Sequence, residues 1–226
     1  MNKYKILSLF LAIALLAAQF RIFTGNNAQE VSTSEAVFQN ILTRSSIREY
    51  TAAPVSRTML DSLCCAAMAA PTAMDKRPWK FVVIDDKAVL QELTKALPYA
   101  QALKTAPAAI AVCGDPTLMD KEHKPTEWWM EDCSAATENI LLAAHSLGLG
   151  AVWLGVYPAE TPVASVSSTL KLPSNLKPLC IVALGHPKGD AQPKNKYAKD
   201  NIRYNVGDFP GAQAGEEEES TEGGGF

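Results

Sequence analysis

The sequence lacks several patterns that mark common classes of protein function. Its 226 residues carry 21 Lys and Arg against 24 Asp and Glu, so it has no basic excess of the kind that nucleic-acid-binding proteins show. It has no CxxC pair and no Cys/His cluster, which argues against a metal site. It also lacks a Gly-x-Ser-x-Gly nucleophile motif and a Gly-x-Gly-x-x-Gly dinucleotide motif. We therefore expect no nucleic-acid partner, no bound metal and no stably bound dinucleotide.

The one long apolar run lies at the N-terminus. Residues 1–5 are short and basic, and residues 6–18 are almost entirely apolar, which is the layout of a secretory signal peptide. A membrane span needs about 20 apolar residues, and this run is shorter. We expect residues 1–28 to be a signal peptide, with a retained N-terminal anchor as the alternative. Either reading predicts an exported protein in the periplasm or another extracytoplasmic compartment, with membrane contact only through an uncleaved N-terminus.

The cysteines are odd in number and show no pairing pattern. Two are adjacent, and the other three lie in apolar runs: Cys64, Cys65, Cys113, Cys133 and Cys180. The simplest interpretation is that they are small buried hydrophobic residues. A disulfide between distant cysteines is left open, because an exported protein meets an oxidising compartment.

Hydrophobic periodicity and capping residues predict five helices and four strands. Ser32, Ser56 and Asp86 each precede an apolar pattern of helical spacing and predict a helix N-terminus. The helices are expected at 33–44, 57–69, 87–97, 131–147 and 162–170, and Gly148 and Gly150 are expected to end the fourth. Short apolar runs predict strands at 81–84, 108–113, 151–156 and 179–184.

The strands are nearly continuous apolar runs, so both faces of the sheet are expected to be covered by helices. The predicted fold is therefore α+β, a three-layer domain with a mixed β-sheet flanked by helices, extending over residues 32–207. Residues 187–205 are polar and extended, so they need another surface on which to lie. Residues 208–226 include four consecutive glutamates and three consecutive glycines and are predicted to be a disordered acidic tail.

Two segments on either side of the second predicted helix suggest a cofactor site. Arg44-Ser45-Ser46-Ile47-Arg48 places two guanidiniums and two hydroxyls within five residues, which suits a phosphate or another anion. Pro71-Thr72-Ala73-Met74-Asp75 is a loop of mostly small residues, where backbone can approach a flat ligand. The alternative for Arg44 and Arg48 is pairing with carboxylates at a helix end.

The order of these features resembles the nitroreductase family of FMN-dependent oxidoreductases, over roughly residues 35–205. The two segments above resemble the family's flavin-binding segments, the second of which reaches the cofactor of the partner subunit. The run 139–150 resembles the family's central helix, and Trp153-Leu154-Gly155-Val156 the strand end beside the flavin ring. The backbone N–H groups of Gly155 and Val156 are expected to donate hydrogen bonds near the reactive flavin nitrogen. The resemblance implies a flavin site made by Arg44, Ser45, Ser46, Arg48, Pro71, Thr72, Ala73, Asp75, Leu154, Gly155, Val156, Lys194 and Lys196.

Two parts of this implied site need comment. The family usually has Asn where this chain has Asp75, and an ionised carboxylate accepts hydrogen bonds but donates none. We expect flavin still to bind, with altered affinity or redox potential. Lys196 falls where the family has a basic residue that contacts the FMN phosphate, and Lys194 is the alternative. A solvated tail is the other interpretation of these lysines.

The resemblance further implies an intertwined homodimer with FMN sites at its interface. No side chain is assigned as catalytic, because the flavin carries the chemistry and the protein binds and orients it. The expected activity is reduction of nitroaromatic or quinone-like substrates, with NAD(P)H as a transient electron donor. The alternatives are an exported flavin-binding or redox-relay protein with little NAD(P)H turnover, and a related reductive dehalogenase.

Overall fold

The computed structural model describes residues 32–118, 127–189 and 191–205. The chain divides after Pro193 into two units, which are described separately below. The predicted signal peptide (1–28) and acidic tail (208–226) lie outside the described residues and stay predictions. No helix among the described residues is both long enough and apolar enough to cross a membrane.

The first unit is built on a four-stranded antiparallel sheet in the order β1-β2-β4-β3. The strands are β1 (Trp79–Ile84), β2 (Ala108–Gly114), β3 (Gly150–Gly155) and β4 (Lys177–Gly185), as predicted to within two residues at each end. The prediction was a mixed sheet, but all three ladders are antiparallel. A single parallel bridge, between Ser46 and Ala151, lies outside these ladders. In this order β1 and β3 are the edges of the sheet.

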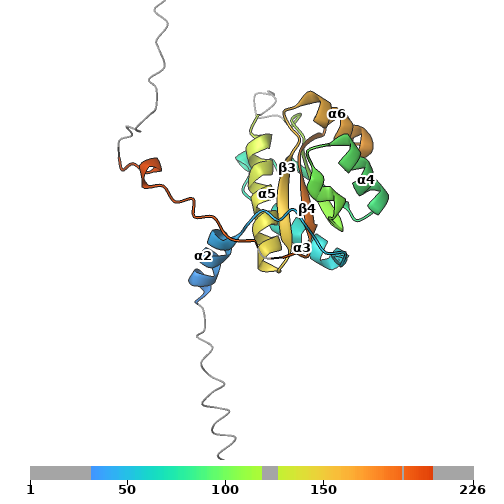
Figure 1. Ribbon diagram of the computed structural model, residues 1–226. Coiled ribbons are helices and arrows are strands. Elements are labelled where there is room, and N and C mark those ends of the chain that lie inside the picture. Colours follow the sequence, from blue (N-terminus) through green and yellow to red (C-terminus); the bar gives the residue numbers. More distant parts are fainter. Residues whose placement is uncertain (1–31, 119–126, 190, 206–226) are drawn as a thin grey trace, which may run out of the picture. The chain divides into compact units, whose positions relative to one another are not determined.

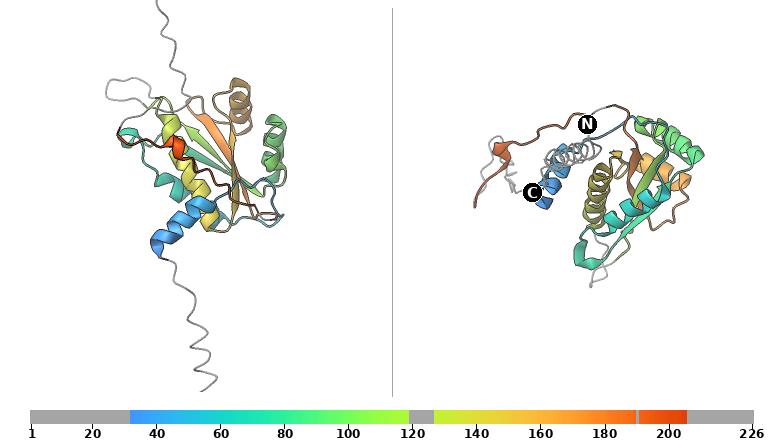
Figure 2. Two further views of the ribbon diagram at one scale, coloured as in Figure 1. Left: turned by 60° about the vertical axis from the view of Figure 1, so that its left-hand side comes forward. Right: turned by 90° about the horizontal axis from the view of Figure 1, so that it is seen from below.

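Helices cover both faces of the sheet (Figures 1 and 2). Helices α3 (Arg57–Met68) and α5 (Trp129–Ser146) pack on one face, and α4 (Lys87–Ala96) and α6 (Glu160–Thr169) on the other. Alternate strand residues such as Ile110 and Ala111 enter opposite cores, because successive side chains of a strand point to opposite faces. This confirms the three-layer α+β fold.

The predicted helix ends follow from local hydrogen bonds. The side chains of Ser32, Ser56 and Asp86 each accept a hydrogen bond from a first-turn N–H, which confirms them as N-caps. After α5, Gly148 adopts a left-handed φ of 71°. Its N–H donates to the His145 carbonyl, and that of Leu149 donates to Ala144, which is the Schellman arrangement.

Helix α2 (Thr33–Thr43) places its apolar side away from the rest of the first unit. Its polar side contacts α5, where Asn40 donates to the Leu142 carbonyl at 3.0 Å and Thr43 Oγ1 lies 2.9 Å from His145 Nε2. The apolar side is exposed, by 50 to 65%, at Val37, Phe38, Ile41 and Leu42. A helix with an uncovered apolar stripe needs a partner surface.

The cysteines are all free thiols. Cys113, Cys133 and Cys180 are fully buried, and burial raises the pKa of Cys113 and of Cys180 to about 12. At neutral pH these groups are protonated, so they behave as small apolar residues, as the sequence indicated. Cys64 is half-buried and Cys65 is exposed, both on α3.

Candidate functional site

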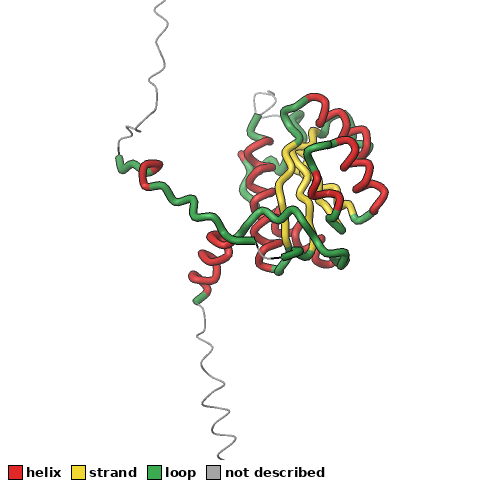
Figure 3. The backbone as a smooth tube through the Cα atoms, viewed as in Figure 1, coloured by secondary structure: helices red, strands yellow, loops and turns green. Residues whose placement is uncertain are grey.

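The segment 44–48 lies along the open edge of β3. The Ile47 N–H donates to the Ala151 carbonyl at 3.0 Å, next to the Ser46 bridge. Figure 3 shows the loop after α2, in green, passing the strands, in yellow. This close approach depends on Gly150, because a Cβ there would lie 2.7 Å from Ile47 Cβ. The first segment is therefore fixed against the sheet by backbone contacts, which leaves the side chains of Ser46 and Arg48 exposed.

Tyr50 anchors the far end of this segment. Its buried hydroxyl lies 2.6 Å from the Ile47 carbonyl and 3.0 Å from that of Ala183, and donates between them. Burial raises the pKa of Tyr50 well above its usual value, so the hydroxyl stays protonated. The loop after Tyr50 then pairs with the chain beyond β4, where the Thr51 N–H donates to the His186 carbonyl.

The two arginines of the segment have different surroundings. Arg44 is largely buried and its Nε lies 3.4 Å from a carboxylate oxygen of Glu138 on α5. That pairing matches the alternative interpretation of Arg44. Arg48 is exposed, and its only hydrogen bond among the described residues is a long one of 3.5 Å to the Ser46 carbonyl. The guanidinium of Arg48 therefore retains donors for a ligand.

The hydroxyls of the segment are also largely available. Ser45 Oγ makes one long contact of 3.5 Å, to the Thr43 carbonyl. Ser46 is exposed, and its hydroxyl makes no hydrogen bond to any residue that the structure describes. Together with Arg48 they form a donor group at one end of the β3 edge.

At the other end of β3, only one of the three predicted flavin-binding residues presents a free backbone donor. The Val156 N–H donates to the Leu179 carbonyl at 3.0 Å. Peptide groups alternate along an antiparallel strand, so the N–H and carbonyl of the preceding Gly155 point to the open edge. A Cβ at Gly155 would meet no atom within 4 Å, so the face of the strand above this exposed residue is also open.

This geometry corrects part of the prediction. The expected donation from the Val156 N–H to the cofactor is wrong, because the β4 side of the ladder already uses that group. The side chains of Leu154 and Val156 are both buried, so neither offers polar contacts. Gly155 lies four residues from Ala151, or about 14 Å along the strand. A ligand bridging both ends must be elongated.

The second predicted segment, residues 71–75, lies next to β1, at the opposite edge of the sheet from β3. Pro71 and Thr72 follow α3, and the 3-10 helix η1 (Ala73–Asp75) leads toward β1. Strands β1 and β3 are separated by two other strands, or about 14 Å between their axes. The structure therefore does not bring residues 71–75 to residues 44–48 within one protomer. This placement fits the expectation that the two segments serve different subunits' cofactors.

A buried carboxylate fixes the second segment. Asp132, in the first turn of α5, is 7% exposed and accepts a hydrogen bond from the Ala73 N–H at 2.8 Å. Three residues just beyond adopt left-handed φ angles near 50°: Met74, Asp75 and Arg77. Such conformations are unfavourable for residues other than glycine and persist only where surrounding contacts impose them.

The unexpected Asp75 has its own counter-charge. Both of its carboxylate oxygens contact Arg77, each at 2.6 Å from Nε or Nη2. The hydrogen bond from Arg77 lowers the pKa of Asp75, so it is ionised at neutral pH. The loop therefore presents a neutral ion pair instead of a bare negative charge.

The remaining predicted residues lie in the second unit. Lys194 and Lys196 are exposed in an extended segment that leads to the 3-10 helix η3 (Lys199–Asn201). Sequence reasoning missed Glu138, Asp132 and Tyr50, which orient the two segments. Of these three residues, only Asp132 could have been noticed in the sequence, because it is a carboxylate in the first turn of a helix that is otherwise mostly apolar.

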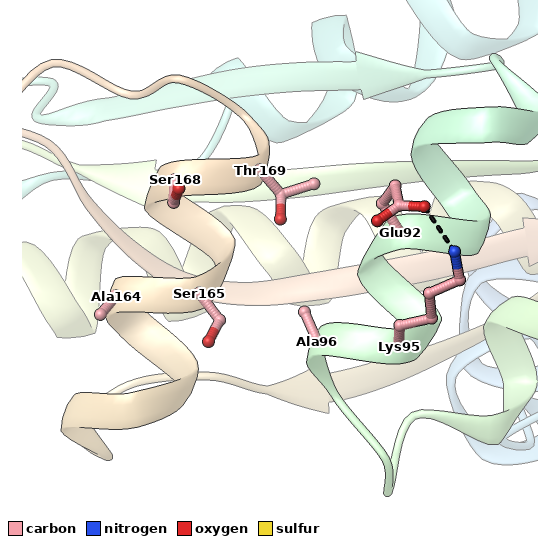
Figure 4. Close-up of a pocket in the computed structure, with 7 residues that line it drawn as sticks. All are labelled: Glu92, Lys95, Ala96, Ala164, Ser165, Ser168 and Thr169. Atoms are coloured by element: carbon pink, nitrogen blue, oxygen red, sulfur yellow. Dashed lines mark hydrogen bonds and ion pairs between the residues drawn. The ribbon is translucent and has the colours of Figure 1, made fainter.

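A surface groove lies elsewhere on the molecule. It has a volume of about 570 Å³ and lies between α4 and α6, where the Glu92–Lys95 ion pair faces Ser165, Ser168 and Thr169 (Figure 4). None of the predicted site residues lines it. Among the described residues, no group of three His, Cys, Asp or Glu side chains is placed to hold a metal ion.

Comparison with known proteins gives consistent matches over the folded part of the chain. The family model described as "Nitroreductase family" matches residues 41–97 and 94–186. A protein of Archaeoglobus fulgidus, provisionally named NADH dehydrogenase/NAD(P)H nitroreductase, is 42% identical over 171 residues. This match covers 76% of the present chain and 94% of the relative.

Solved structures agree with this match. A Parabacteroides distasonis protein with the same provisional name is 40% identical, with a TM-score of 0.71, over 76% of this chain and 98% of its own. An FMN-dependent nitroreductase from Clostridium difficile is 30% identical, with a TM-score of 0.67, over 75% of this chain and 99% of its own.

Proposed function

The chain belongs to the nitroreductase family of oxidoreductases, and from this membership we propose that it is an FMN-dependent enzyme that reduces nitroaromatic or quinone-like substrates. The observation that carries the proposal is the open edge of β3. Hydroxyl and guanidinium donors lie at one end of it, at Ser46 and Arg48, and a backbone N–H lies at the other, at Gly155. FMN has a phosphate at one end and a flat ring system at the other.

The residues present fit this cofactor. Ser45, Ser46 and Arg48 supply hydrogen-bond donors and a positive charge for an anionic group. The Gly155 N–H supplies a directional donor for a ring atom, and the missing side chain lets a planar group approach the strand. When bound, FMN supplies the hydride and electron transfer, so no acid–base pair of side chains is required.

We propose that the active form is a homodimer whose sites use both chains. The apolar stripe of α2 is uncovered, which supports an interface there. The loop 71–75 leads into β1, the edge strand opposite β3, which supports a site that a second copy completes. The resemblance implies a basic residue of the second unit that contacts the FMN phosphate, Lys196 or alternatively Lys194, and this stays a prediction.

Reduction by a nicotinamide tests this proposal. Mixing the yellow protein anaerobically with NADH or NADPH should bleach the flavin within seconds, and adding a quinone or nitroaromatic should restore the colour. The donor would bind transiently, because the chain has no dinucleotide motif. Flavin that stays oxidised on mixing would contradict the proposed enzyme and support the flavin-binding or redox-relay alternative.

Asp75→Asn tests whether the unusual carboxylate tunes the site. Removing one negative charge near an anionic cofactor should tighten FMN binding by about two- to fivefold and raise its midpoint potential, as exposed charge pairs have small effects. Titration of flavin-free protein and redox titration measure these quantities. Asp61→Asn, on the exposed side of α3, removes the same charge elsewhere. Equal affinity and potential in wild type and Asp75→Asn would show that Asp75 does not act on the flavin.

A further inference from the structure

Tyr99 makes a contact at the open edge of β3 that the sequence did not indicate. It lies in the connection between α4 and the 3-10 helix η2 (Gln101–Lys104). Its hydroxyl donates to the Gly155 carbonyl at 2.6 Å, across 56 residues of sequence. The tyrosine is 53% exposed, so it is not a core residue. A hydrogen bond between exposed groups adds little to folding stability, so the main effect of this one is on the local conformation of the strand end.

The contact completes the restraint of one peptide group. The Gly155–Val156 peptide is held on one side by donation from the Val156 N–H to Leu179. On the other side its carbonyl accepts from Tyr99. Glycine has the greatest backbone freedom of any residue, so without Tyr99 this strand end would be held from one side only.

The same contact changes what a ligand at the edge encounters. The N–H and carbonyl of Gly155 point to the same side of the strand. An uncapped carbonyl would place an acceptor beside the donor, where it would repel an acceptor atom of the ligand. Partial burial raises the pKa of Tyr99, which keeps its hydroxyl protonated as a donor.

We propose that Tyr99 is a positioning residue for the flavin ring. Its hydroxyl occupies the Gly155 carbonyl and fixes this strand end, so that the Gly155 N–H is the group presented to the cofactor. This inference rests on the proposed function, since it concerns the same edge of β3.

Tyr99→Phe removes the hydroxyl and keeps the ring. In flavin-free protein, backbone hydrogen exchange at Val156 should accelerate about fivefold, the effect expected from losing one hydrogen bond. In the full-length protein loaded with FMN, affinity should fall by a similar factor of about five, and the visible absorption bands should shift. Tyr204→Phe is the matched control, since Tyr204 is 85% exposed and far along the chain from β3.

The outcomes separate the two proposals. If wild-type protein binds no FMN, the proposed function fails, and this inference fails with it. If wild type and Tyr99→Phe bind FMN with equal affinity and identical spectra, only the role of Tyr99 is overturned, whatever the exchange rates. If Tyr99→Ala weakens binding and Tyr99→Phe does not, the ring matters instead of the hydroxyl, and the positioning role is likewise overturned.

Discussion

Phe38→Glu is expected to convert the protein from dimer to monomer and to remove its bound flavin. Phe38 lies on the apolar side of α2 and is 65% exposed in the protomer, so the substitution leaves the protomer's own core intact. In a symmetric dimer the charge enters the interface twice. Losing two apolar contacts and burying two carboxylates costs about 4 kcal/mol or more, a dissociation constant raised at least about a thousandfold.

In the proposed dimer the site is divided between the chains, so flavin should be lost together with the dimer. Size-exclusion chromatography with light scattering measures the assembly, and absorbance measures the flavin. Gln39→Glu adds the same charge one residue along α2, outside the apolar stripe, and should remain a dimer. A Phe38→Glu protein that stays dimeric and yellow would show that α2 does not form the interface.

Arg48→Ala should weaken FMN binding by about 10- to 100-fold. A hydrogen bond to a charged group contributes about 1.5–3 kcal/mol, and about 1.4 kcal/mol corresponds to a factor of ten. Arg48 is exposed and makes one long contact in the protomer, so its removal should leave the fold unchanged. Fluorescence titration of flavin-free protein with FMN measures the affinity.

Arg57→Ala is the matched control for this experiment. Arg57 is also exposed, but it pairs with Asp85 at the beginning of α3, away from the β3 edge. Arg48→Lys should fall between wild type and alanine, since lysine keeps the charge but lacks the guanidinium fork. Unchanged affinity in Arg48→Ala would remove Arg48 from the site.

The fold could be predicted from the sequence because its signals are local. Ser32, Ser56 and Asp86 each mark the beginning of a helix, because their side chains accept hydrogen bonds from backbone N–H groups two or three residues further on. Apolar runs identified the strands, but they could not give strand direction, since burial on both faces produces the same pattern in parallel and antiparallel sheets. The sheet was therefore expected to be mixed, whereas all three of its ladders in the described part of the chain are antiparallel.

The site could be predicted only in part, because several of its contacts join distant positions. No spacing rule connects Tyr99 with Gly155, Asp132 with Ala73, or Arg44 with Glu138. The Val156 N–H was misassigned because the alternation of peptide groups depends on the register of β3 against β4. The apolar pattern of α2 located the helix correctly, but only the fold reveals that this face is uncovered.

The visible absorption spectrum of the purified protein tests the central claim most directly. The account predicts a yellow protein, or a colourless one that becomes yellow when FMN is added, with one FMN bound per chain at saturation. A colourless protein that does not take up FMN would contradict the assignment of the β3 edge as a flavin site.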